Sequence, residues 1–211
     1  MAAVTKQRRN SGRRNREDEV MEAAVAVFSE KGYAAASLQD VADRVGLLKG
    51  SLYHYISSKE SLLFRIFDEA HSQALILMAE VDEQKLPPDR KLWAYVERLS
   101  LWYLGNRERA SLYFTEWRYL TGEYETAVRA QRREFELYLR DMLIEAREAG
   151  LTRADLDARI SSAYILSAVN SVPIWYRPGG PLKPAELARQ VAELSYQAAF
   201  GRKKASKLRV G

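Results

Sequence analysis

The short segment Lys49–Tyr55 carries side chains suited to contacts with a nucleic acid. It begins with small residues, Gly50 and Ser51, so a helix formed here could lie in a DNA major groove close to the base edges. Its lysine, its tyrosines and His54 can reach phosphate oxygens. The alternative is a helical hairpin whose residues only fill a protein core.

Two helices joined by a tight turn would position these side chains. Val41, Ala42 and Val45 place apolar residues at helical spacing before the turn. Gly46 can adopt the left-handed conformation that a tight turn between helices often needs. The stretch Leu38–Leu62 therefore predicts a helix-turn-helix.

The order of residues around this turn resembles the DNA-binding domain of the TetR family of bacterial transcriptional regulators. The resemblance rests on Ser37 followed by Asp-Val-Ala, then Val-Gly, then Lys-Gly-Ser-Leu-Tyr-His-Tyr and Ser-Lys-Glu-Ser-Leu. It runs from Val20 through Leu63 and includes Gly32–Tyr33 at the end of the first helix. Leu47–Leu48 departs from the family pattern, in which the second position is commonly small or polar. This departure affects the base contacts rather than the fold.

The resemblance implies a role for each residue of the second helix of this motif, the recognition helix. Residues near base edges would be Lys49, Gly50 and Ser51, and residues facing phosphates would be Tyr53, His54 and Tyr55. Tyr53 could equally pack against the first helix. His54 could instead serve a metal or catalytic site, but His71 is the one other histidine, and two histidines alone rarely form such a site. Leu52 is expected in the core.

Residues on both flanks of the motif are implied as well. Ser37 would cap the second helix and bond to the DNA backbone, and Lys59 would contact a phosphate with help from the positive end of its helix. Arg13 and Arg14, beside a basic N-terminal arm, would add phosphate or minor-groove contacts. The alternative for the arm is a disordered terminus that only aids solubility.

The net charge of +5 comes from the two ends of the chain. Residues 1–20 hold six basic and three acidic side chains, and residues 202–211 hold five basic side chains and no acidic one. The body between them therefore has more acidic than basic groups. We expect a basic flexible arm (1–12), a helix-turn-helix domain (13–60), a ligand-binding and dimerisation domain (61–201) and a basic tail that stays away from DNA.

Composition and motifs exclude several classes of protein. The chain has no cysteine, so disulfide frameworks and thiolate zinc sites are excluded. It has neither a secretory signal nor a long uncharged apolar run, which predicts a cytoplasmic protein without a membrane span. No glycine-rich phosphate loop, zinc spacing or recognisable nucleophile triad is present, which argues against an enzyme.

Helical periodicity dominates the whole chain, so we expect an all-α fold of about nine helices. Glycines, prolines and a serine cap mark the ends of these helices. Outside the helix-turn-helix, the expected helices are Arg14–Lys31, Ser58–Glu83, one from Pro88 to the break at Gly105, Arg107–Leu120, Glu123–Ala149, Asp155–Tyr176 and Pro184–Phe200.

Aromatic residues are frequent after the helix-turn-helix. Each alone is typical of a core, but together they predict a cavity for a bulky apolar ligand. The candidate ligand-binding residues are Trp102, Tyr103, Trp117, Arg132, Asn170, Trp175 and Arg177.

The segment Trp175–Leu182 resembles part of the TetR-type repressors of fatty-acid and steroid catabolism, whose ligands are acyl-CoA thioesters. The resemblance implies arginines that pair with the CoA phosphates, either Arg177 or the group of Arg129, Arg132 and Arg133. The alternative is a helix end, a glycine turn and the start of a new helix with no further role.

The last two helices predict a homodimer held by a four-helix bundle. Their small and apolar positions are Ala163, Leu166, Ala168, Leu187, Val191, Leu194 and Ala198, which could instead be core of a single chain. A single helix-turn-helix reads one half-site, so a dimer on a palindromic operator adds specificity.

We therefore expect a ligand-responsive regulator of double-stranded DNA, a repressor that is released by a hydrophobic small molecule and needs no cofactor. The rivals are a helical adaptor that does not bind DNA and a regulator that senses a different hydrophobic molecule.

Overall fold

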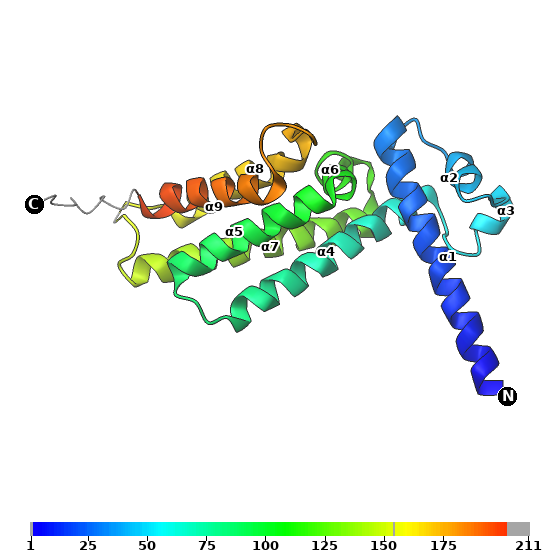
Figure 1. Ribbon diagram of the computed structural model, residues 1–211, viewed down its shortest axis with the longest axis horizontal. Helices are drawn as coiled ribbons and strands as arrows, with labels where there is room; N and C mark the ends of the chain where they lie inside the picture. Colours follow the sequence, from blue (N-terminus) through cyan, green and yellow to red (C-terminus); the bar gives the residue numbers. More distant parts are fainter. Residues whose placement is uncertain (1, 154, 202–211) are drawn as a thin grey trace, which may run out of the picture. The chain divides into compact units, whose positions relative to one another are not determined.

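The computed structural model describes residues 2–153 and 155–201, with side chains from residue 16 onward. Every regular element in these ranges is a helix, as predicted (Figure 1). The elements are α1 (Ala2–Lys31), α2 (Leu38–Arg44), α3 (Lys49–Leu52), α4 (Lys59–Glu83), α5 (Pro88–Gly105), α6 (Arg107–Thr115), the short 3-10 helix η1 (Trp117–Tyr119), α7 (Gly122–Glu148), α8 (Ala158–Trp175) and α9 (Pro184–Phe200). None of the described helices is long and apolar enough to span a bilayer.

Four helix boundaries differ from the prediction, and one of them is the start of α8 at Ala158 rather than at Asp155. Helix α1 begins at Ala2 rather than near Arg14. The alanine, lysine, glutamine and arginine residues between these two positions favour a helix, and no proline interrupts them. Helix α3 ends at Leu52, and the expected helix after Arg107 stops at Thr115 and continues only as η1. The side chains of Arg13 and Arg14 and the whole basic tail lie outside the described residues.

The chain divides into two compact units. The first contains the residues up to Gln73 together with Asn106–Gln131, and the second contains Ala74–Gly105 and the residues from Arg132 onward. The chain passes from one unit to the other inside α4, between α5 and α6, and inside α7. Two of these three passages are therefore uninterrupted helix.

The first unit is built around α1, which packs against α2 and α6. The apolar stripe predicted for the first helix is buried, and its members are Val20, Ala23, Ala24, Val27 and Phe28. The ring of Phe28 meets Tyr33 edge-on at 5.2 Å between centroids, and Phe67 of α4 meets Tyr113 of α6 at 5.3 Å.

Polar contacts join distant parts of the chain within this unit. Arg109 of α6 donates to Glu22 of α1 and to Glu69 of α4, and its own side chain is only 13% exposed. At the start of α4, Glu60 accepts hydrogen bonds from the backbone N–H and the hydroxyl of Thr121, at 2.6 and 2.9 Å. These contacts attach the segment 106–131 to α1 and α4.

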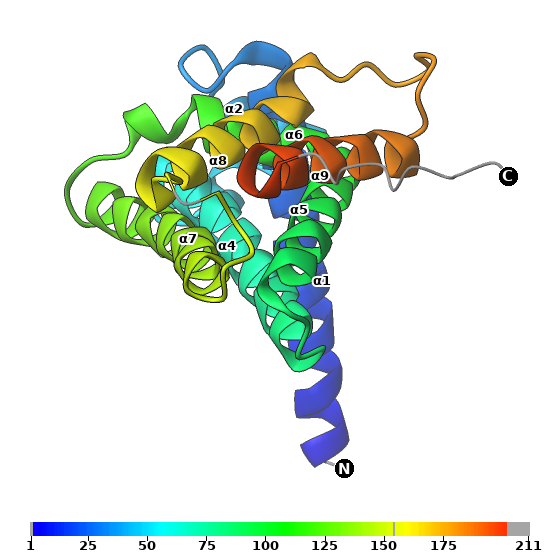
Figure 2. The same cartoon turned by 90° about the vertical axis from the view of Figure 1, so that its left-hand side faces the viewer.

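The second unit is held mainly by apolar packing. Helix α9 packs against α5, and α8 packs against both of them (Figure 2). Tyr95 and Leu92 of α5 and Leu139 of α7 are almost fully buried in its core. A polar contact also crosses this core, because the Tyr103 hydroxyl donates to Oδ1 of Asn170 over 3.1 Å.

Candidate nucleic-acid interface

A capping box fixes the start of α2. The backbone N–H of Asp40 donates to the Ser37 hydroxyl over 3.2 Å, and the backbone N–H of Ser37 donates to the Asp40 carboxylate over 2.8 Å. Lys31, at the end of α1, also donates to Asp40 over 2.6 Å. The Lys31 ammonium and the Ser37 donors lower the pKa of Asp40 to about 2. Ser37 therefore caps α2 as predicted, and α2 is attached to α1.

The end of α2 is fixed by a second contact with α1. Arg44 forms a two-bond ion pair with Glu30, at 2.6 and 2.7 Å, and this hydrogen-bonded guanidinium lowers the pKa of Glu30. The chain then turns at Gly46, which has a φ of 65°. The left-handed conformation predicted for this glycine is confirmed.

Helix α3 is short, and buried apolar side chains on its inner side hold it in place. Leu52 is fully buried and Ile56 is 5% exposed, so the inner side of the segment belongs to the core. Beyond Leu52 the chain leaves the helix as a turn, in which the backbone N–H of Tyr55 donates to the carbonyl of Leu52 over 2.9 Å. The side chain of Arg65 donates to the Tyr55 carbonyl over 3.0 Å and holds this turn against α4.

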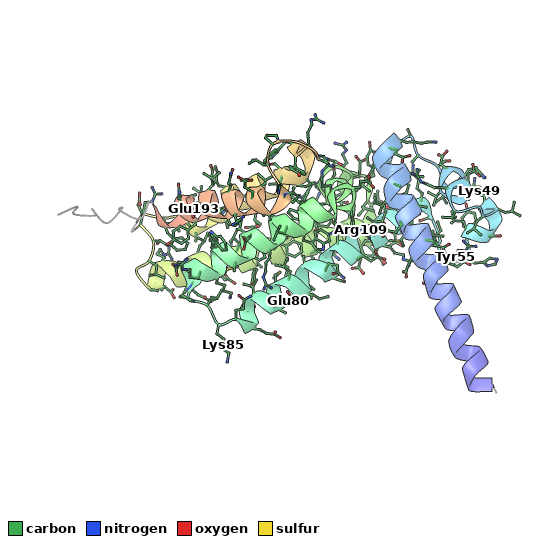
Figure 3. The ribbon with its side chains drawn as sticks, viewed as in Figure 1. Lys49, Tyr55, Glu80, Lys85, Arg109 and Glu193 are labelled. Carbon is green, nitrogen blue, oxygen red and sulfur yellow. The ribbon has the colours of Figure 1, made fainter. Side chains whose placement is uncertain are left out.

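The outer face of α3 consists of the exposed residues Leu48, Lys49, Gly50, Tyr53 and His54. Lys49 is the first residue of α3, and Tyr55 lies in the turn that follows it (Figure 3). Tyr53 is 51% exposed, while Ser51 and Tyr55 are partly covered. Of the residues of this segment predicted to contact bases or phosphates, Lys49, Gly50, Tyr53 and His54 are therefore exposed.

Gly50 is not required by the fold. Its φ lies outside the left-handed region, and a Cβ built at this position would meet no atom within 4 Å beyond its two chain neighbours and the backbone of its own helix. A glycine within a helix is less favourable than alanine by about 1 kcal/mol. The packing of the chain therefore does not explain the missing side chain at position 50, which leaves room for close approach to this surface.

Lys59 has contacts within the chain that the sequence pattern did not predict. Its ammonium group lies 4.3 Å from the centre of the Tyr33 ring and 3.5 Å from the carbonyl oxygen of Ala34. Burial lowers the pKa of Lys59. The first turn of α4 therefore contacts the loop after α1 through Lys59 and the start of α7 through Glu60.

The candidate ligand-binding residues come from both units of the chain. Tyr103 and Asn170 are hydrogen-bonded in the second unit, and the Trp102 ring lies 5.8 Å from that of Tyr103. Trp117 lies in the first unit, where the guanidinium of Arg129 is 5.1 Å from its ring.

The remaining ligand candidates lie elsewhere in the second unit. Trp175 is 51% exposed, and its Nε1 donates to the hydroxyl of Ser171 within α8. Arg177 is exposed and Arg132 is half-buried on α7, while the neighbouring Arg133 pairs with Glu136. Of the set predicted from the sequence, Trp102, Tyr103 and Asn170 lie together in the second unit.

A stripe of apolar and small residues covers the outer side of α8. Its exposed members lie at helical spacing, with the half-buried Ser171 between Ala168 and Ile174, and they are Ile160, Ala163, Tyr164, Ser167, Ala168, Ile174 and Trp175. On α9, Leu194 is 66% exposed and Ala198 is also exposed. Leu187 and Val191, which were also candidates for a dimer contact, are buried within the single chain, and for them the core alternative holds.

Comparisons with known proteins agree with this arrangement. Residues 20–66 match the family described as bacterial regulatory proteins, tetR family, and residues 85–199 match the family described as tetracyclin repressor-like, C-terminal domain. The repressor KstR2 of Rhodococcus jostii is 27% identical over 181 residues, which cover 85% of this chain and 89% of that protein.

Two solved structures show the same fold. PfmR of Thermus thermophilus is 29% identical with a TM-score of 0.77, and the match covers 84% of this chain and 97% of that one. AibR, solved with isovaleryl coenzyme A and operator DNA, has a TM-score of 0.79 at 24% identity, with 89% and 100% of the two chains covered.

Proposed function

The chain belongs to the TetR family of bacterial regulatory proteins, and from this premise we propose that it is a repressor that binds a palindromic operator as a homodimer and leaves it when a hydrophobic effector binds. A protein that regulates bacterial genes works in the cytoplasm, where the operator DNA lies. The proposal needs no cofactor, because binding and release involve no covalent step.

Gly50 is the observation that carries the DNA-binding part of this proposal. The fold leaves open space where its side chain would stand, and Lys49 beside it is exposed. A glycine that weakens its own helix but allows close approach fits a helix that enters the major groove. A helical adaptor that does not bind DNA would have no need of this combination.

The exposed stripe on α8 supports the homodimer. An apolar surface of this kind is costly to leave in water and is typical of a protein–protein interface. A second copy of the chain presents the same stripe, so two copies related by a two-fold axis would cover it mutually. Such a dimer also carries two α3 helices, as a palindromic operator requires.

For the effector, we propose a hydrophobic molecule and, as the more specific candidate, an acyl-CoA thioester. The hydrogen-bonded pair of Tyr103 and Asn170 offers polar atoms among the aromatic residues of the second unit. AibR, which shares the fold, binds isovaleryl coenzyme A. The rival is a regulator of the same family that senses another hydrophobic compound.

Release would follow from a shift between two states. In one state the two α3 helices of the dimer are placed to fit the operator, and in the other they are not. An effector lowers operator affinity only to the extent that it binds the second state more tightly than the first. Because α4 and α7 both pass from one unit to the other without a break, they are the elements through which we expect this bias to act.

The test starts with duplexes selected from a random-sequence DNA pool by the full-length protein. We expect enrichment of a two-fold symmetric sequence, binding that weakens as salt rises, and release by isovaleryl-CoA or a longer acyl-CoA but not by CoA alone. Native mass spectrometry on the same samples reports the dimer and any bound thioester. Failure to enrich any sequence would overturn the DNA-binding proposal, whereas release by none of the thioesters would overturn only the acyl-CoA candidate.

A further inference from the structure

Leu48 is the most exposed large apolar side chain that the structure describes. It is 80% exposed, compared with 68% for Ile160, the next in order. It stands immediately before Lys49, on the outer face of α3 rather than on the α8 stripe. Single exposed apolar residues are common on protein surfaces, so exposure alone does not assign it a role.

The backbone explains why Leu48 is outside the core. Its φ of −70° and ψ of 142° are extended, so its side chain does not share the inner side of α3 with Leu52, four positions later. Leu47 is half-buried, which leaves Leu48 as the apolar residue that meets solvent at the turn.

Leucine is also the wrong type of residue for the local structure. Leu48 is the N-cap of α3, a position where serine, threonine, asparagine or aspartate would accept a hydrogen bond from the helix, and it makes no such bond. The position therefore lacks a cap and leaves a large apolar group in water. Departures from local rules of this kind are expected where a residue serves function rather than folding. Gly50, two positions later on the same face, is a second departure.

The major groove contains one apolar group on its base edges, the 5-methyl group of thymine. We propose that Leu48 reads a thymine in each half-site of the operator by packing against this methyl group. The proposal rests on the DNA binding proposed above and adds a specificity contact to it. The exposed face of α3, where Leu48 adjoins Lys49 and Gly50, places an apolar group beside the polar ones that would approach base edges and phosphates.

The experiment measures the coupling between the leucine and the methyl group. Each thymine of the selected duplex is replaced by deoxyuridine, symmetrically in both half-sites, and binding is measured for the wild type and for Leu48→Ala. For the wild type, we expect loss of the methyl group at one position to weaken binding about fourfold per half-site, the effect of burying one methyl-sized group. Leu48→Ala should bind the thymine and deoxyuridine duplexes equally at that position.

Two further variants keep the result interpretable. Ile76→Ala removes an exposed apolar side chain from α4 in the other unit and should keep the wild-type response to deoxyuridine. Leu48→Ser supplies a capping hydroxyl, so it should raise the melting temperature while it loses the response to deoxyuridine.

The outcomes separate this proposal from the one on which it depends. If no duplex is enriched, the DNA-binding function itself fails. If a duplex is enriched but Leu48→Ala keeps the full preference for thymine, or if no deoxyuridine substitution weakens the wild type, then Leu48 does not read a methyl group and the proposal is overturned.

Discussion

The outer face of α3 and the exposed stripe of α8 are two surfaces of the same chain that each lower its stability, but by different means. On α3, Gly50 weakens its helix and Leu48 leaves the helix without a cap. On α8, Ile160 and Tyr164 keep large apolar surfaces in water, at 68% and 65% exposure. The first pattern fits a partner that must approach closely, and the second fits a partner that must cover area.

The two helices that carry these surfaces also differ in length and in capping. Helix α3 is four residues long and depends on Leu52 and on the capping box of α2 for its position. Helix α8 has 18 residues and its own cap, since Asp157 accepts hydrogen bonds from the backbone N–H groups of Arg159 and Ile160. A few placed groups are enough to read DNA, whereas a stable dimer needs a long surface.

The largest effect should come from a charge placed in the α8 stripe. Tyr164→Glu would bury an unpaired carboxylate twice in a symmetric interface, so we expect dimerisation to weaken by at least about 3 kcal/mol, more than a hundredfold, and operator binding to fall with it. Analytical ultracentrifugation measures the first effect and fluorescence anisotropy with the selected duplex the second.

The control for this experiment is Ile76→Glu, which introduces the same charge at an exposed apolar residue of α4 outside the stripe. It should leave the dimer intact. A Tyr164→Glu protein that stays dimeric at the concentrations where the wild type is dimeric would show that the stripe is not the interface.

The next effect separates two residues of the α3 face. Lys49→Ala should reduce operator binding by roughly 1–3 kcal/mol and relax base preference, while His54→Ala should weaken selected and random duplexes alike. Parallel anisotropy titrations with both duplexes give the ratio of affinities. An equal loss on both duplexes for Lys49→Ala would place this lysine among phosphate contacts rather than base contacts.

Gly50→Ala should move stability and function in opposite directions. The added methyl group has open space in the free protein, so the free energy of unfolding should rise by about 0.5–1 kcal/mol, while operator binding should weaken by about 1 kcal/mol because the methyl group meets DNA. Thermal unfolding and anisotropy measure the two changes.

Gly105→Ala is the matched control, because Gly105 also lies in a helix with ordinary φ and open space around a Cβ. It should raise stability without a change in DNA binding. If Gly50→Ala behaves in the same way, the missing side chain at position 50 has no role in binding.

The smallest effect concerns the support of the α3 face at low pH. Because Lys31 and Ser37 lower the pKa of Asp40 from 3.8 to about 2, its stabilising contribution is complete above about pH 4 and is lost as the pH falls towards 2. Asp40→Asn should therefore be less stable than the wild type at neutral pH. Urea unfolding across this range should show the difference shrinking as the pH falls, and a constant difference would contradict the assignment.

Much of the helix-turn-helix could be predicted from sequence because its signals are local. Ser37 with Asp40, the left-handed Gly46 and the buried Leu52 each act within a few residues of the chain. The end of α3 at Leu52 was missed, because the pattern does not show where serines and aromatic residues outweigh helix propensity.

The remaining errors depend on contacts between distant residues. Arg109 and Glu22 are 87 positions apart, and no periodicity connects them. Apolar spacing on α9 likewise marks Leu187 and Leu194 as equivalent, yet the first is buried within the chain and the second is exposed. The grouping of Tyr103 and Trp117 in one ligand site stays a prediction, because the two residues belong to different units of the chain.

The contacts of Arg109 limit how this protein can be re-engineered. A chimera that carries only the first 66 residues onto another regulator would leave behind Arg109, the partner of Glu22, and Thr121, the partner of Glu60. The transplanted N-terminal segment would keep its α3 face but lose the polar contacts that attach it to the segment 106–131. A portable DNA-reading module from this chain therefore comprises two pieces of sequence, and both must be exchanged together.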